Sequence, residues 1–188
     1  ITAAESAPRL LAGIMALTLA GGDSFHLVPR VRSLVSGKAD ELRAALGRGK
    51  QVTSITMTVF YLLLWWIGCQ LAPLATDTPW TVVLVVLAVV RIALCFMPQN
   101  GWTQEKPPVS WGIIRNVPFA AMGVIVAVRF AMTGSAIPSM SLAWLAILVS
   151  FGCYLPVVIW ADRYPQVGAL MLPKTCAYVW LLAMCLGI

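Results

Sequence analysis

Short polar connections divide the chain into six long apolar stretches, and this pattern constrains the fold more than any other feature. A helix needs about 20 mostly apolar residues to cross a bilayer. Six such helices with short connections account for nearly all of the 188 residues. Only 11% of the residues are charged and 60% are hydrophobic, against roughly 25% and 45–50% in soluble proteins. The sequence therefore predicts an all-α polytopic transmembrane helix bundle. It excludes a soluble enzyme, a nucleic-acid-binding domain and a disordered tail.

The expected spans form a single integral membrane domain over residues 1–188. Pro29 is expected to close the first span, since proline inside a helix removes a hydrogen bond and clashes with the preceding turn. The polar segment 30–50 has leucine and alanine at helical spacing, so we expect a loop with a short amphipathic helix on the membrane surface. Because the chain begins with Ile1 rather than Met, we expect a seventh, N-terminal span before the first. The other spans cover about 9–28, 51–74, 80–97, 113–133, 139–161 and 166–188.

Lysine and arginine are concentrated in three of the connections between spans. The first, third and fifth connections hold nine of these residues, whereas the opposite side holds only Arg9 and Arg129. Connections rich in Lys and Arg stay in the cytoplasm. We therefore expect these three connections in the cytoplasm and the C-terminus outside. The Arg129 side chain, near the outer end of its span, is expected to extend to water.

Three ionisable residues lie inside the expected spans at similar depth. A charge at the centre of a membrane helix costs about 2.5–3.5 kcal/mol on insertion scales, so each one needs a reason. At about 1.5 Å per residue, Asp23 lies roughly 9 Å, Arg91 roughly 10 Å and Lys174 roughly 12 Å from the cytoplasmic end of its helix. Three separate helices therefore place one carboxylate and two cations in the same layer of the membrane.

Other polar residues are expected to complete this layer. His26 and Arg30 follow Asp23 at i+3 and i+7, on the same helix face, and Pro173 frees a backbone carbonyl beside Lys174. One carboxylate against two cations leaves one positive charge. The pattern predicts a cytoplasm-facing pocket that binds or transports a small anionic or zwitterionic molecule. The candidate ligand-binding residues are Asp23, His26, Arg30, Arg91, Arg115, Asn116, Lys174 and Tyr178.

Other functions are compatible with the same residues. In a structural or sensory protein, Asp23, Arg91 and Lys174 would form a dry, fully paired cluster that only fixes helix packing. In a membrane-embedded enzyme, His26 and Asp23 would act as acid and base on a lipid headgroup, although no second catalytic cluster accompanies them. A lysine in the last span is also typical of retinal proteins, but the adjacent Pro173 and the outside C-terminus differ from theirs.

The sequence offers few ligands for a metal or cofactor. A single histidine excludes a multi-histidine zinc site and a bis-histidine haem. The five cysteines are scattered in or near apolar stretches, without a C-x-x-C pair. We expect no metal, no cofactor and no nucleic-acid partner. The expected partners are membrane lipids and a small anionic ligand, and the oligomeric state stays open.

Five blocks of the sequence resemble an uncharacterised family of bacterial polytopic membrane proteins. They are GGDSFHLVPR (21–30), SITMTVFY (54–61), RIALCFMPQN (91–100), SWGIIRNVPFA (110–120) and MLPKTCAYVW (171–180). The resemblance covers nearly the whole chain. It implies a multi-pass protein of the bacterial cytoplasmic (inner) membrane with seven helices, and it carries no activity. The Pro98–Gln99 dipeptide is also similar to PQ-loop transporters, at that one position only.

Overall fold

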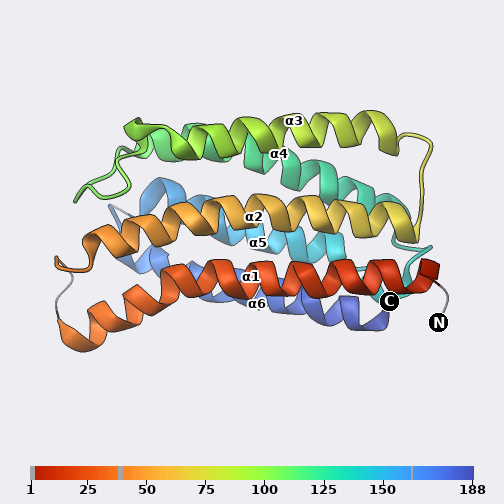
Figure 1. Cartoon of the computed structure of the whole chain (residues 1–188), viewed down its shortest axis with the longest axis horizontal. Helices are drawn as coiled ribbons and strands as arrows, with labels where there is room; N and C mark the ends of the chain where they lie inside the picture. The colour runs from red at the N-terminus through yellow and green to blue at the C-terminus, as the bar shows by residue number, and fades with distance from the viewer. Residues whose placement is uncertain (1–2, 38–39, 162) are drawn as a thin grey trace.

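Six α-helices lie alongside one another in the computed structural model, which describes residues 3–37, 40–161 and 163–188 (Figure 1). The chain is 84% helical, and the described residues form no strand. Six segments are long and apolar enough to cross a membrane. The predicted all-α, multi-pass membrane fold is therefore confirmed. The α-helices are α1 (Ala3–Ser36), α2 (Arg43–Leu71), α3 (Asp77–Phe96), α4 (Val109–Thr133), α5 (Ala143–Trp160) and α6 (Met171–Met184), and the 3₁₀ helices are η1 (Pro98–Asn100), η2 (Pro138–Met140), η3 (Pro165–Leu170) and η4 (Cys185–Gly187).

The first helix is longer than the sequence predicts. α1 passes through Pro29 and ends at Ser36, so the expectation that this proline closes the helix is wrong. α1 packs along α2, and Gly49 of α2 lies directly against the backbone of α1 at His26. A proline removes one helical hydrogen bond. Packing against α2 just before Pro29 supports the helix across that missing bond.

The expected surface helix is also absent as a separate element. α2 begins at Arg43 and continues without a break to Leu71, so residues 43–50 are its first two turns. Gly22 of α1 lets the two helices approach closely, because a Cβ atom there would collide with the Thr56 side chain. The Thr53 hydroxyl donates a hydrogen bond to the Gly22 carbonyl at 2.9 Å. These contacts hold α2 against α1 just beyond its first two turns.

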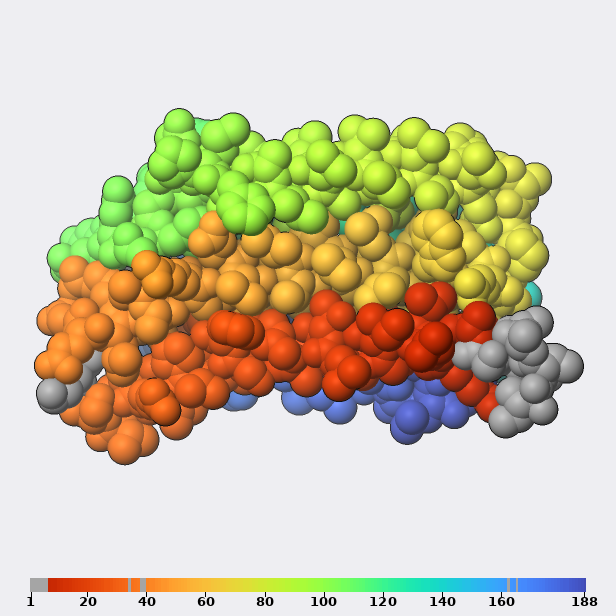
Figure 2. Space-filling model, in the orientation of Figure 1, coloured from red at the N-terminus to blue at the C-terminus, as the bar shows by residue number. Residues whose placement is uncertain are grey.

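α3 shows how the bundle separates a buried face from a lipid-facing one. α3 is apolar on every side apart from its ends and one arginine, and its exposed residues include a row of valines, such as Val82, Val86 and Val89. Figure 2 shows α1, α2 and α3 side by side in one continuous face of the molecule. The buried residues of α3 follow helical spacing, which places an arginine on the inner stripe. This stripe consists of Leu84, Ala88, Arg91 and Cys95.

The two ends of the bundle differ in composition. The α1–α2, α3–α4 and α5–α6 connections all lie at one end, on the left in Figure 1. We call this the basic end, because nine of the 13 Lys and Arg residues lie in or beside these connections. The α2–α3 and α4–α5 connections, the start of α1 and the C-terminus lie at the opposite end. The connections are therefore grouped at the two ends as the sequence predicts.

An aromatic cluster fills the centre of the bundle. Neighbouring rings pack edge to face or tilted, with centroids 5.0 to 5.7 Å apart, a spacing typical of favourable aromatic pairs. All five side chains are buried. They come from α2, α4, α5 and α6, so the cluster joins four helices. It consists of Phe60, Tyr61, Phe119, Phe151 and Tyr178.

Candidate functional site

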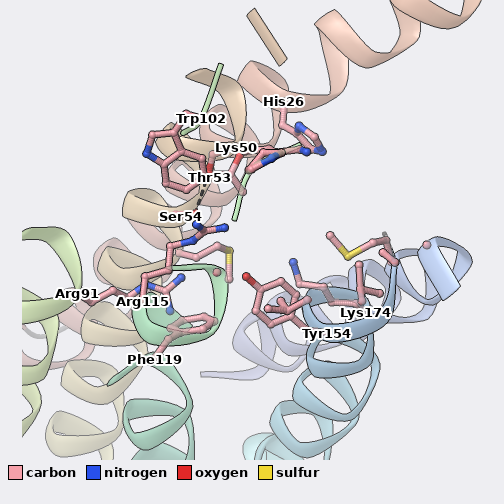
Figure 3. Close-up of a pocket in the computed structure, with 18 of the residues that line it drawn as sticks. His26, Lys50, Thr53, Ser54, Arg91, Trp102, Arg115, Phe119, Tyr154 and Lys174 are labelled. Carbon is pink, nitrogen blue, oxygen red and sulfur yellow. Dashed lines mark hydrogen bonds between the residues drawn. The ribbon is translucent and has the colours of Figure 1, made fainter. Parts of the chain in front are cut away.

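A cavity of about 410 Å³ opens within the basic end of the bundle (Figure 3). All six α-helices or their adjoining segments contribute to its lining. Phe119 and Tyr154 lie at the inner end of this cavity, while His26 and Trp102 lie at the other end, which we call the mouth. Among the lining residues that the structure describes, none is Asp or Glu. The five lysines and arginines in the lining are Arg30, Lys50, Arg91, Arg115 and Lys174.

Arg91 is the most deeply buried of these cations. It is 1% exposed, because it lies on the buried stripe of α3. Its guanidinium carbon lies 3.4 Å from the centre of the Phe119 ring. Its Nε and Nη1 atoms are buried and have no hydrogen-bond partner. A cation over a ring is stabilised by the ring quadrupole, but the ring does not cancel its charge. Arg91 therefore keeps its positive charge and has two buried, unpartnered nitrogens beside the cavity.

Lys174 lies on the opposite side of the cavity. Like Arg91, it is buried and lies close to aromatic rings. It is 9% exposed, and its Nζ lies 4.8 Å from the Tyr154 ring centre and 5.3 Å from that of Tyr178. The preceding Pro173 does not interrupt a helix as expected, since α6 starts only at Met171 after η3. Proline is tolerated in a first helical turn, where its missing N–H has no helical acceptor anyway. The chain thus starts a new helix just before the lysine.

Arg115 is anchored between α4 and the segment that follows α3. Its Nη1 donates to the Asn100 side-chain oxygen at 3.0 Å, and its guanidinium carbon lies 4.2 Å from the Trp102 ring centre. Gly101 between those two residues has φ +57°, a left-handed conformation that glycine adopts without strain. The Trp102 indole donates to the Cys95 carbonyl at 2.9 Å. This turn fixes the indole and the amide around one face of the guanidinium.

Tyr154 is held in position by an amide on α4. Its hydroxyl donates to the Asn116 side-chain oxygen at 3.0 Å, and the Asn116 amide nitrogen donates to the Gly112 carbonyl at 2.8 Å. The Tyr154 ring lies at right angles to Phe119, with centroids 6.1 Å apart. The two rings that contact Arg91 and Lys174 therefore lie next to each other between the two cations, and Asn116 orients one of them.

The mouth adds further polar groups. His26 of α1 lies there near Lys50 and Thr53 of α2 (Figure 3), and Arg30 and Ser54 also line the cavity. His26 Nδ1 is buried and has no hydrogen-bond partner. Both hydroxyls are already engaged, since Thr53 donates to Gly22 and Ser54 to the Lys50 carbonyl. The mouth thus has cationic and imidazole groups, while its hydroxyls point at the backbone.

Asp23 does not take the position that the sequence reasoning gave it. It is not part of the described lining, and no direct ion pair joins it to Arg91 or Lys174 among the described residues. Asp23 is close enough to Lys174 for an electrostatic interaction. The cavity cations are therefore not neutralised by direct pairing with this carboxylate.

Arg129, at the opposite end, does not extend to water as expected. It is 3% exposed, with Nε 3.0 Å from Asp77 Oδ1 and Nη2 3.0 Å from Asp77 Oδ2. Nη2 also donates to the Ala72 carbonyl at 2.9 Å. Asp77 begins α3 and Ala72 follows α2. The α2–α3 connection thus supplies acceptors for Arg129 near the membrane surface, and the side chain has no need to reach water.

The structure brings together five of the eight candidate residues, namely His26, Arg30, Arg91, Arg115 and Lys174. Asn116 and Tyr178 act behind the lining, through Tyr154 and Lys174. The sequence reasoning missed Phe119, because an aromatic residue in a membrane helix is usually packing, and Trp102, because it lies in the connection between α3 and α4. It counted Lys50 only as a topology marker. Among the described residues, no group of three His, Cys, Asp or Glu side chains lies close enough to hold a metal ion.

No family model, curated protein or solved structure matches the chain. The resemblance to bacterial polytopic membrane proteins therefore stays a prediction, and function has to be argued from the geometry of the cavity.

Proposed function

We propose that this membrane protein binds a small anion in the cavity at its basic end. The observation that carries this proposal is that Arg91, Arg115 and Lys174 lie around one cavity with no described carboxylate in its lining. Keeping a cation in the membrane without a counter-charge is costly. A bound anion would supply the missing counter-charge, and the unpartnered donors of Arg91 would bind its oxygens.

The geometry favours an anion over a zwitterion. A zwitterion needs an acceptor for its positive group as well as donors for its negative group. The one carboxylate expected to fill that role, Asp23, is not in the described lining. Guanidinium and ammonium groups match phosphate, sulfate and carboxylate oxygens, with Arg91 and Arg115 able to donate in pairs. We therefore narrow the ligand to an oxyanion.

Two other functions are less well supported by the same geometry. A cluster that only fixes helix packing would be dry and fully paired, whereas this cavity is roomy and Arg91 has unpartnered donors. An enzyme would need a nucleophile or a second acid–base group beside His26. The nearby Thr53 and Ser54 hydroxyls donate to backbone carbonyls. Binding, with or without transport, fits the described residues better than catalysis does.

The proposed location follows from the charge asymmetry. We propose that the basic end faces the cytoplasm, since connections rich in Lys and Arg stay there, and that the protein lies in a bacterial inner membrane. The cavity would then take its ligand from the cytoplasm or from the cytoplasmic leaflet. Labelling of a cysteine placed at Glu105, between α3 and α4, tests this orientation. Reaction with an impermeant reagent from outside intact cells would contradict it.

Thermal unfolding of the purified full chain tests the binding proposal. A ligand that binds only the folded state raises the melting temperature Tm. Phosphate and sulfate, at constant ionic strength in a neutral detergent, should raise Tm more than chloride does. Lys174→Met and Arg91→Met should lose this rise. Arg48→Met is the matched control, because Arg48 is an exposed cation of α2 outside the cavity lining. An equal rise in all variants would show that the effect is not due to the cavity.

A further inference from the structure

One wall of the cavity carries no charge among the described residues. α5 contributes Tyr154, Val157, Val158 and, just after its end, Ala161 to the lining. Their i, i+3, i+4 and i+7 spacing places them on a single face of the helix. We call this set the α5 wall. The cationic side chains come from α1, α2, α3, α4 and α6. The cavity is therefore cationic on several sides and mainly apolar along α5.

The α5 wall runs lengthwise along the cavity. Its first residue, Tyr154, lies at the inner end, beside Lys174 at 4.8 Å. Its last residue, Ala161, lies at the basic end of the bundle, where the connection to α6 begins. Seven helical steps of about 1.5 Å give a wall of roughly 10 Å. A molecule whose charged group reaches the inner cations would lie along this wall with its remaining part.

The size of the cavity points in the same direction. Its volume of about 410 Å³ lies within the range of roughly 300–1,000 Å³ that is usual for small-molecule sites. An inorganic phosphate or sulfate has five heavy atoms and would fill only a fraction of this space. Water would fill the remaining volume, and the valine and methionine side chains of the lining would stay in contact with that water.

We infer that the ligand is amphipathic, with an oxyanion bound by Arg91, Arg115 and Lys174 and an apolar body packed on the α5 wall. This inference rests on the proposed function, since it assigns the chemistry of the ligand in the same cavity. Two kinds of molecule fit this description, namely a membrane lipid with a terminal phosphate and a water-soluble organic phosphate. Both have the chemistry of an alkyl phosphate.

A series of n-alkyl phosphates tests this inference on the full chain in phosphatidylcholine nanodiscs. The probes are inorganic, methyl, butyl and hexyl phosphate, each below its micelle concentration, and the readout is the apparent Kd from the shift in Tm. Burial of one methylene group strengthens binding by up to about fourfold. We expect the affinity to rise with each lengthening of the chain and to level off once the wall of roughly 10 Å is covered.

Variants of the α5 wall separate this effect from simple partitioning into lipid. Val157→Phe fills the apolar side, so it should remove most of the gain with chain length while inorganic phosphate still binds. Ile159→Phe is the matched control, because Ile159 lies on the same helix and is 43% exposed. Gly112→Ala is a milder second variant. Its added methyl would lie 3.9 Å from Val158 and from Arg115, an ordinary contact, and it should weaken hexyl phosphate by up to about fourfold.

The outcomes distinguish this inference from the proposed function. A gain with chain length that is lost in Val157→Phe and kept in Ile159→Phe supports the inference. Phosphate binding that depends on Lys174 but not on chain length overturns the inference and leaves the proposed function standing. A gain with chain length that persists unchanged in Lys174→Met overturns both, because the ligand would then bind elsewhere.

A last arm separates the two sources of the ligand. Phosphatidic acid, included in the nanodisc at a few percent, tests a lipid, and hexyl phosphate, added from water, tests a soluble anion. Competition for one site supports the inference whichever source binds more tightly. Stabilisation by phosphatidic acid that Lys174→Met, Arg91→Met and Val157→Phe all leave intact counts against it.

Discussion

The two ends of the bundle each bury an arginine, at 1% exposure for Arg91 and 3% for Arg129. Arg129 forms a two-point ion pair with Asp77 and a third hydrogen bond to Ala72. Arg91 lies over the Phe119 ring, and two of its three nitrogens have no partner. The two residues have the same chemistry and nearly the same burial, but they differ in what surrounds them.

A membrane protein can thus bury an arginine either to pack its helices or to bind a ligand. A carboxylate cancels the charge of the arginine it pairs with. The Arg129–Asp77 pair therefore has no net charge with which to attract an anion. An aromatic ring stabilises a cation without cancelling its charge. Arg91, whose guanidinium is not deprotonated in proteins, thus keeps its positive charge beside the cavity.

The largest effect is expected at the paired end. Asp77→Leu leaves Arg129 buried without its counter-charge, which costs about 3–5 kcal/mol for a buried pair. The free energy of unfolding in mixed detergent–SDS micelles measures this loss. The double variant Asp77→Leu/Arg129→Leu should recover most of it, because no buried charge is left unpaired. A loss below about 1 kcal/mol in the single variant would contradict a buried pair of this kind.

Anion binding should belong to the basic end alone. Phosphate at about 100 times its Kd should raise the free energy of unfolding by about 2.7 kcal/mol. Arg91→Met should abolish this increase, since its donors bind the anion. The double variant Asp77→Leu/Arg129→Leu should keep it, because that pair lies outside the cavity. The comparison fails if the paired end contributes as much to the phosphate response as the cavity does.

The position of the Tyr154 ring at the basic end should depend on its hydrogen bond to Asn116. Asn116→Leu removes the acceptor of the Tyr154 hydroxyl, and an unsatisfied, mostly buried polar group costs about 1–3 kcal/mol. The same unfolding measurement applies. In a Tyr154→Phe background the substitution should cost less, because no hydroxyl remains to be satisfied. Equal costs in both backgrounds would show that the 3.0 Å hydrogen bond does not position the ring.

The smallest effect is expected when the unpaired cation is removed without any anion present. Replacing a buried charge with an apolar residue of similar volume is often neutral or stabilising. In phosphate-free buffer, Arg91→Met should therefore lower the free energy of unfolding by less than about 1 kcal/mol, or raise it. A loss comparable to that of Asp77→Leu would mean that Arg91 is a packing residue like Arg129.

Much of the fold could be predicted from the sequence. Six apolar stretches define six membrane helices whatever their packing, because length and hydropathy are local properties. The depth of Arg91 and Lys174 followed from counting residues along their helices. The rotation of those helices about their axes could not be predicted from the sequence, because α3 is apolar on all sides and shows no preferred face. Only its neighbours decide that Arg91 lies on the inner stripe while Val89 is 62% exposed.

The errors of the sequence prediction come from contacts between distant segments. Pro29 does not end α1, because α2 packs against the preceding turn at Gly49. Arg129 does not extend to water, because Asp77 lies 52 residues earlier in the chain and yet directly beside it. Local rules for proline and for arginine near a membrane surface contain no information about such partners.

The amino-acid sequence was enough to predict the membrane helix bundle, which the structure confirms, and it predicts a similar depth for Asp23, Arg91 and Lys174. The tertiary structure alone decided which charges are paired, because pairing depends on helix rotation and on which segments meet at each end. It placed an aromatic ring instead of a carboxylate beside Arg91. An aromatic ring leaves a cation its charge, and this physical difference separates the cavity from the rest of the bundle.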